Sequence, residues 1–67
     1  MKEATEQEYK QHINEQGASK LLKVTEEYPH GSYSITYYMD YAKKVMVAHM
    51  VFDPDFGKSG RFLYYIC

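Results

Sequence analysis

Alternation of side chains in the second half of the chain constrains its fold most strongly. Residues 33–39 read Tyr-Ser-Ile-Thr-Tyr-Tyr-Met, so Tyr33, Ile35, Tyr37 and Met39 share one face of an extended strand. Other segments combine period-two patterns or β-branched residues with intervening turn residues, such as the Pro-His-Gly-Ser that precedes Tyr33. We therefore expect four strands joined as an antiparallel meander, at residues 20–28, 33–39, 44–52 and 61–66.

The segment before these strands has the features of one helix, at residues 5–16. Thr5 and Glu8 have the spacing of a capping box, in which a hydroxyl and a carboxylate accept from free amides at the helix start. Gly17 is the expected left-handed stop, and Tyr9 and Ile13 form a thin apolar stripe. The sequence predicts one α+β domain over residues 1–67, with an N-terminal helix packed on a four-stranded antiparallel β-meander.

Such a small domain leaves part of the sheet without cover. A chain of 67 residues buries only about 60% of the surface that its unfolded form exposes. One helix covers one sheet face in part, whereas the third strand carries apolar side chains on both, with Val51 on one face and Met50 and Phe52 on the other. Either the uncovered face meets a partner or the sheet curls so that both faces are partly covered.

Charge and cysteine content narrow the class of protein. Eight basic and nine acidic side chains give a net charge of −1, which argues against binding of duplex DNA. The single cysteine, Cys67, cannot form an internal disulfide and fits a reducing compartment. The polar amino end resembles no signal peptide, and the longest apolar run, residues 45–52, is too short to span a bilayer. We expect a cytoplasmic protein without membrane contact.

The segment 52–60, Phe-Asp-Pro-Asp-Phe-Gly-Lys-Ser-Gly, contains fragments of phosphate-binding and metal-binding motifs. A phosphate-binding loop requires glycine where Phe52 stands and a helix after Ser59, where a β-rich run follows instead. Asp53 and Asp55 lack the glutamate that closes a calcium loop. We interpret the segment as a turn shaped by proline and glycine, with no cofactor and no metal.

No catalytic group of residues emerges elsewhere. His12, His30 and His49 lack close metal-ligand spacing, and His49, in an apolar strand, is better explained as a hydrogen-bonded core or rim residue. Cys67 is the last residue, where a thiol is poorly positioned to act as a catalytic nucleophile. We expect a protein that is not an enzyme.

The run from Val51 to Ile66 resembles a family of small uncharacterised proteins carried on enterobacterial prophages and plasmids. The residues that carry the resemblance are Phe52, Asp53, Pro54, Asp55, Gly57, Arg61, Tyr65 and Ile66. This chain lacks the tryptophan of that family's third strand and spaces its loop differently. The resemblance implies a mobile-element origin and no assigned activity.

Eight tyrosines and no tryptophan suggest a binding function. Rigid aromatic side chains dominate many protein interfaces, so we expect a protein-binding module, with an inhibitor of a host defence complex of the CRISPR or restriction type as a specific form. The alternative is a single-stranded nucleic-acid-binding protein that stacks bases on tyrosines and contacts phosphates through lysines. The candidate contact residues are Tyr33, Tyr37, Tyr38, Tyr64, Tyr65 and Arg61; the candidate phosphate ligands are Lys20, Lys23, Lys43, Lys44, Lys58 and Arg61.

Self-association is a further expectation. The last strand of a meander lies at a sheet edge, and residues 61–67 carry one charge and strong β propensity. Antiparallel pairing of two such edges predicts a homodimer through the C-terminal strand. The competing outcome is that the helix or the amino-terminal tail covers this edge.

Overall fold

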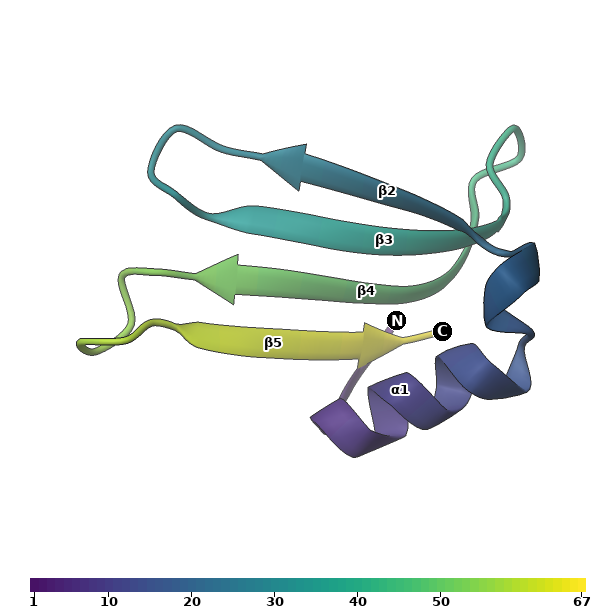
Figure 1. The fold of residues 1–67 in the computed structure, drawn as a ribbon, viewed down its shortest axis with the longest axis horizontal. Helices are drawn as coiled ribbons and strands as arrows, with labels where there is room; N and C mark the ends of the chain where they lie inside the picture. Colours follow the sequence, from purple (N-terminus) through teal and green to yellow (C-terminus); the bar gives the residue numbers. More distant parts are fainter.

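A computed structural model describes residues 1–67 as one helix beside a five-stranded antiparallel sheet (Figure 1). The strands lie in the order β1-β5-β4-β3-β2. The α+β class and the meander of the last four strands are confirmed, whereas the predicted count of four strands is wrong. The elements are β1 (Lys2–Ala4), α1 (Glu6–Glu15), the short 3-10 helix η1 (Ala18–Lys20), β2 (Leu22–Glu27), β3 (Tyr33–Asp40), β4 (Val45–Asp53) and β5 (Arg61–Ile66).

The predicted signals set the limits of α1. The Thr5 hydroxyl accepts a hydrogen bond from the Glu8 amide at 3.1 Å, and the Glu8 carboxylate accepts one from the Thr5 amide at 2.9 Å. These bonds complete the capping box and hold the pKa of Glu8 below its ordinary value. Gly17, with φ of 81°, turns the chain out of the helix after Gln16.

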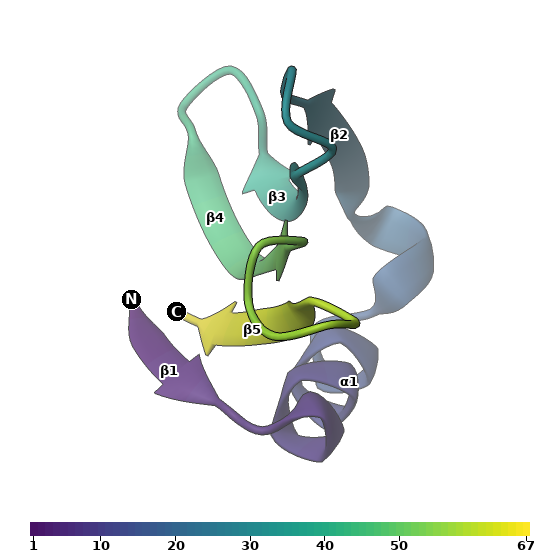
Figure 2. The ribbon, with the colours of Figure 1, turned by 90° about the vertical axis from the view of Figure 1, so that its left-hand side faces the viewer.

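The unpredicted strand β1 changes the sheet edge. Lys2, Glu3 and Ala4 pair antiparallel with Ile66, Tyr65 and Tyr64, so the amino-terminal tail covers this end of β5 (Figure 2). Lys-Glu-Ala has no strand pattern of its own; its extended form follows from bonding to the free amides and carbonyls of β5. The prediction that the C-terminal strand forms the sheet edge is therefore wrong for residues 64–66, whereas Arg61, Phe62 and Leu63 have no strand partner on that side. The homodimer expected through that strand stays a prediction.

The connection between β3 and β4 also differs from the prediction. Strand β4 begins at Val45, which pairs with Asp40, and not at residue 44 as expected; the Asp40 carboxylate accepts a hydrogen bond from the Lys43 amide at 3.2 Å. Lys44 has a positive φ of 57°, and its ammonium lies 3.6 Å from the centroid of the Tyr41 ring. A register shift beside the turn leaves Met39 without a partner on β4. The alternation predicted through Met39 therefore ends at Tyr37.

Only five apolar side chains are buried, and they form one small core. Tyr9 and Ile13 of α1 belong to a cluster with Val47, Ala48 and Met50 of β4. The helix lies mainly against β4, β5 and β1, and it reaches β3 through the ring of Tyr9, which lies 6.4 Å from that of Tyr37. Figure 2 shows α1 beside β5, on one side of the twisted sheet. We call the sheet face that α1 contacts the helix side and the opposite face the open face.

Candidate binding faces

The candidate contact residues do not form one site. Strand register places Tyr33 and Tyr37 of β3 and Tyr64 of β5 on the helix side, aligned with Phe52, Ala48 and Met50 of β4. The other three candidates, Tyr38, Tyr65 and Arg61, lie on the open face. The predicted grouping of six residues at one interface is therefore wrong.

Two of the helix-side tyrosines, Tyr37 and Tyr64, are partly buried and pack against the core. The Tyr9 ring lies 5.0 Å from that of Tyr64 and 6.4 Å from that of Tyr37, measured between centroids. Burial, with the neighbouring phenols of Tyr37 and Tyr64, raises the pKa of Tyr9 to about 12. These tyrosines fasten α1 to the sheet, which explains them without a ligand.

A row of aromatic rings continues on the helix side beyond α1. Tyr33 stacks on Phe52 at 5.3 Å, Phe52 lies 4.9 Å from Phe62, and Phe62 lies 6.4 Å from Tyr64. Phe62 is 48% exposed. The row thus extends over β3, β4 and β5, through the cross-strand pairs of Tyr33 with Phe52 and of Phe52 with Phe62. The list of candidate contact residues lacks Phe52 and Phe62, because only the register shows that Phe52 lies between Tyr33 and Phe62 across three strands.

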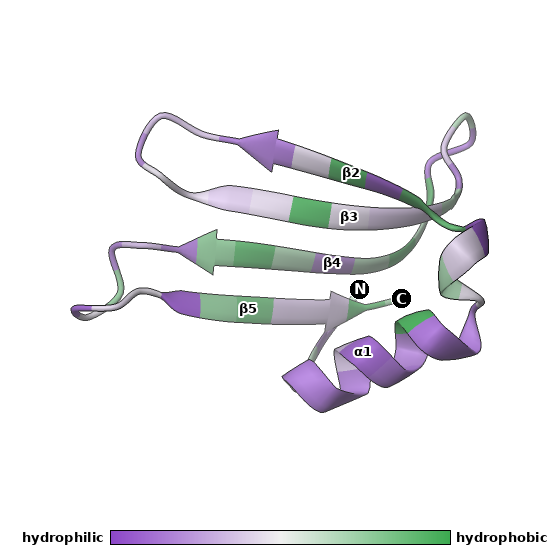
Figure 3. Ribbon diagram, viewed as in Figure 1, coloured by the Kyte–Doolittle hydropathy of each residue, from purple (hydrophilic) through white to green (hydrophobic).

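The open face carries apolar side chains with no helix or strand over them. Ser34 and Thr36 of β3 are buried there, so side chains of the neighbouring strands β2 and β4 must shield them. Hydropathy along the ribbon shows apolar residues on every long strand (Figure 3). The larger apolar and aromatic residues of this face are Leu22, Val24, Tyr38, Met46, Val51, Leu63 and Tyr65.

His49 occupies the middle of the open face. Its Nδ1 atom lies 2.8 Å from the Thr36 hydroxyl, and its ring centroid lies 6.1 Å from that of Tyr65. Burial lowers the pKa of His49, and the Glu26 carboxylate opposes this only in part. The expected hydrogen-bonded histidine is confirmed, at the rim of the core.

This histidine makes stability depend on pH. Folding lowers its pKa from the ordinary value of 6.5, so the unfolded chain binds the proton more tightly. The free energy of unfolding should fall as the pH drops below about 6.5 and level off below the folded-state pKa. Urea titrations between pH 7.5 and 5 check this. His49→Gln should flatten the profile, and exposed His30→Gln should leave it unchanged; a profile that keeps its slope without His49 would contradict the assignment.

Arg61 and Tyr38 are occupied by neighbours within the chain. Arg61 Nε lies 3.7 Å from the Asp53 carboxylate, and its guanidinium carbon lies 4.2 Å from the centroid of the Phe56 ring. The Tyr38 ring lies 5.1 Å from that of Tyr41. Both side chains therefore support the ends of the hairpins as well as forming the margin of the open face.

The segment between β4 and β5 is a turn, as predicted. The Asp55 amide donates to the Asp53 carboxylate at 3.1 Å, and Gly57 and Gly60 both have positive φ. Gly60 leads directly into β5, so no helix amino end follows Ser59. The geometry of a phosphate-binding loop is absent.

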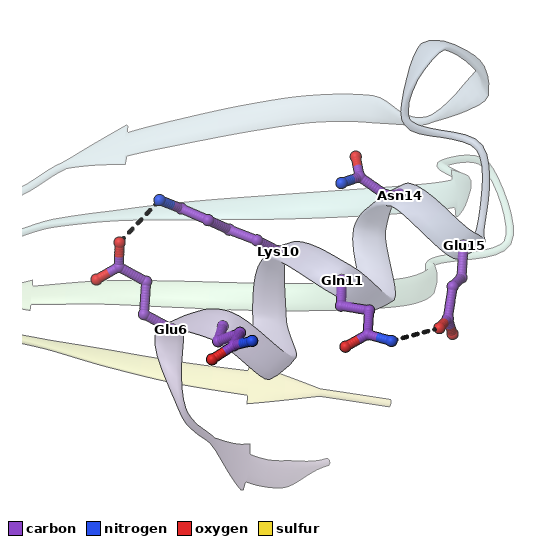
Figure 4. A pocket seen from close by; sticks show the side chains of 6 residues that line it. Glu6, Lys10, Gln11, Asn14 and Glu15 are labelled. Atoms are coloured by element: carbon purple, nitrogen blue, oxygen red, sulfur yellow. Dashed lines mark hydrogen bonds and ion pairs between the residues drawn. The ribbon is translucent and has the colours of Figure 1, made fainter.

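Two shallow hollows flank α1. One, of about 390 Å³, lies between α1 and β3 and is lined mainly by Tyr9, Ile13, Ala18 and Tyr37. The other lies on the outer face of the helix, where six polar side chains surround it (Figure 4). There Lys10 pairs with Glu6 at 2.8 Å and Gln11 bonds Glu15 at 3.1 Å. These bonds run within one exposed helix face and enclose no ligand site.

Comparison with known proteins assigns the chain to no family. No family model matches it, and neither the curated proteins nor the solved structures give a match. The resemblance to mobile-element proteins therefore stays a prediction. No helix is long and apolar enough to cross a membrane. No group of three or more His, Cys, Asp or Glu side chains is arranged to hold a metal ion.

Proposed function

We propose that this protein is a protein-binding module that uses the open face of its sheet. The observation that carries the proposal is an uncovered face with apolar and aromatic side chains from β2, β3, β4 and β5. Leu22 on this face is 48% exposed. The neighbouring Val24, Met46, Val51 and Leu63 are half-buried. Contiguous apolar surface that no other element covers usually marks an interaction site in a small domain.

The small core supports the same proposal. Five buried apolar side chains leave little hydrophobic stabilisation for 67 residues. A partner on the open face would remove further apolar side chains from water, and each fully buried Val or Leu contributes about 1.5–3 kcal/mol. Association would thereby stabilise the fold as well as produce the complex.

The specific form that we propose is a cytoplasmic inhibitor of a bacterial defence complex of the CRISPR or restriction type. Its support is the resemblance of residues 51–66 to proteins of prophages and plasmids, together with a fold that presents a surface and no evident catalytic residues. Such an inhibitor acts by occupying a surface of the defence complex.

A matched pair of variants tests the proposal. Leu22→Lys puts a charge on the open face, whereas Thr25→Lys puts the same charge on the helix side of the same strand; both positions are exposed. The chain should protect an incoming targeted plasmid in enterobacterial cells that carry a CRISPR or restriction system. Leu22→Lys should lose this protection and the co-purifying protein, and Thr25→Lys should keep both.

Two results would contradict the proposal in different ways. Protection and capture that survive in Leu22→Lys would show that the open face is not the binding surface. The other result is that the original chain captures a protein without protecting the plasmid, and that Leu22→Lys abolishes this capture. This result would support a protein-binding module and reject the role against defence systems. Circular dichroism of each variant excludes loss of fold as the cause.

Single-stranded nucleic-acid binding is the second candidate, and the aromatic row on the helix side favours it. Rings on adjacent strands can stack successive bases, at about 1–3 kcal/mol for each base. Against it, Glu27 pairs with Tyr33 at one end of the row and places a carboxylate where a phosphate would lie. Fluorescence anisotropy with short single strands at two salt concentrations tests this. Salt-sensitive binding lost in Phe62→Ala and kept in Phe56→Ala would favour nucleic acid.

A further inference from the structure

The charges at the edges of the open face identify the kind of partner that it fits. Strand register puts Glu3 of β1 at one edge and Glu26 of β2 at the other. Neither Glu3 nor Glu26 forms an ion pair, and the Glu26 carboxylate accepts one side-chain hydrogen bond, from the Tyr28 hydroxyl at 3.1 Å. Both carboxylates are exposed. The apolar face is thus bounded by a free negative charge on each side.

Few positive charges lie on this face. Lys2 and Lys23 alternate to the helix side, opposite Ile66 and Tyr37. Arg61 lies on the open face and pairs with Asp53 at 3.7 Å. The remaining lysines lie on α1, on η1 or in turns, and of these Lys44 approaches the face at its hairpin end, with its ammonium 5.6 Å from the centroid of the Tyr38 ring. The two long edges of the face are therefore negative, and apolar side chains lie between them together with Ser34, Thr36 and His49.

This charge pattern disfavours a second copy of the chain. Two sheets that pack face to face about a two-fold axis along the strands bring the edge with Glu3 near the edge with Glu26. A two-fold axis across the strands brings each edge onto itself. Both arrangements oppose carboxylate to carboxylate, which costs free energy at a desolvated interface. Phosphate groups would meet the same repulsion.

The dimensions of the face fit one helix. The apolar residues extend from β2 to β5, which spans about 14 Å at roughly 4.8 Å between strands. A helix with its side chains is about 10–12 Å wide. The strands β3 and β4 are eight and nine residues long, or about 26–30 Å, which equals a helix of about 18 residues.

We propose that the open face binds an amphipathic α-helix of a partner protein, with an apolar ridge on the sheet and Lys or Arg on both flanks. This inference rests on the proposed protein-binding function and names its partner class. The ridge covers Val24, Val51 and Leu63, and the flanking cations reach Glu3 and Glu26 by lying along the apolar surface.

Synthetic peptides test the inference without knowledge of the natural partner. One probe is an 18-residue Leu/Lys peptide with leucine at i, i+3, i+4 and i+7 spacing and lysine on both flanks. A Leu/Glu peptide of the same pattern and a Leu/Lys peptide of scrambled order are the controls. In nuclear magnetic resonance titrations of the full chain, the first probe should shift the amides of Val24, Val51 and Leu63, and the controls should not.

Neighbouring glutamates provide the matched variants. Glu3→Gln with Glu26→Gln should weaken binding of the Leu/Lys peptide by about five-fold, since two rim ion pairs are lost. The double variant Glu3→Gln and Glu27→Gln should show only about half of that weakening, because Glu27 lies on the helix side and only Glu3 borders the open face. Added salt should reduce the difference between the two double variants.

Three results would overturn the inference. These are no binding of the Leu/Lys peptide, equal binding of the Leu/Glu peptide, and shifts confined to the acidic outer face of α1. The proposed function fails on a different result, namely retention of protection and capture by Leu22→Lys, so the two failures are distinguishable.

Discussion

Replacement of Tyr9 by alanine should lower the free energy of unfolding by about 3–5 kcal/mol. Tyr9 is 7% exposed and joins α1 to the sheet through the rings of Tyr37 and Tyr64. Loss of a buried aromatic side chain costs about 3–5 kcal/mol, and a domain of 67 residues has a total stability of roughly 3–10 kcal/mol. The substitution therefore removes a large part of the stability.

Urea unfolding followed by far-ultraviolet circular dichroism measures this effect. Gln7→Ala, at an exposed position of the same helix, is the matched control and should stay within about 0.5 kcal/mol of the original chain. Tyr9→Phe keeps the ring and should retain most of the stability. An unfolding midpoint of Tyr9→Ala equal to that of Gln7→Ala would show that α1 does not depend on this contact.

The sequence predicted the parts of the fold that local signals determine. The capping box of Thr5 and Glu8, the glycine stop and the alternation in residues 33–37 act within a few residues, and each is present as expected. Strand β1 was missed because Lys2–Ala4 has no strand propensity and becomes extended only by pairing with the distant end of the chain.

The candidate site was predicted less well, for a geometric reason. Tyr37 and Tyr38, like Tyr64 and Tyr65, are adjacent in a strand and must point to opposite faces. This alternation alone divides the six candidates between the two faces of the sheet. Strand register across the whole sheet determines which face α1 covers and which carboxylates flank the other face. Neighbouring residues in the sequence do not contain this information.

A side chain at Gly60, in the turn before β5, should also lower the stability of the fold strongly. Gly60 has φ of 74°, and a Cβ atom there would lie 2.8 Å from the Asp53 carbonyl oxygen and 2.8 Å from Cζ of Phe52. The carbonyl belongs to the paired end of β4, opposite Arg61, and cannot move freely. The Phe52 ring is held between Tyr33 and Phe62. Neither neighbour can yield without displacing the aromatic row.

Gly60→Ala should therefore lower the free energy of unfolding by about 2–5 kcal/mol, as the sum of left-handed backbone strain and overpacking. Gly57→Ala in the same turn is the matched control. Gly57 also has a positive φ, of 65°, but nothing lies within 4 Å of its added Cβ, so strain alone should cost about 1 kcal/mol. Urea unfolding of both variants separates the two contributions. Equal losses would mean that Phe52 and the Asp53 carbonyl move aside, and that the aromatic row is loosely held. A larger loss for Gly60→Ala, with an altered near-ultraviolet spectrum of the aromatic rings, would show that this glycine lets the turn close onto Phe52.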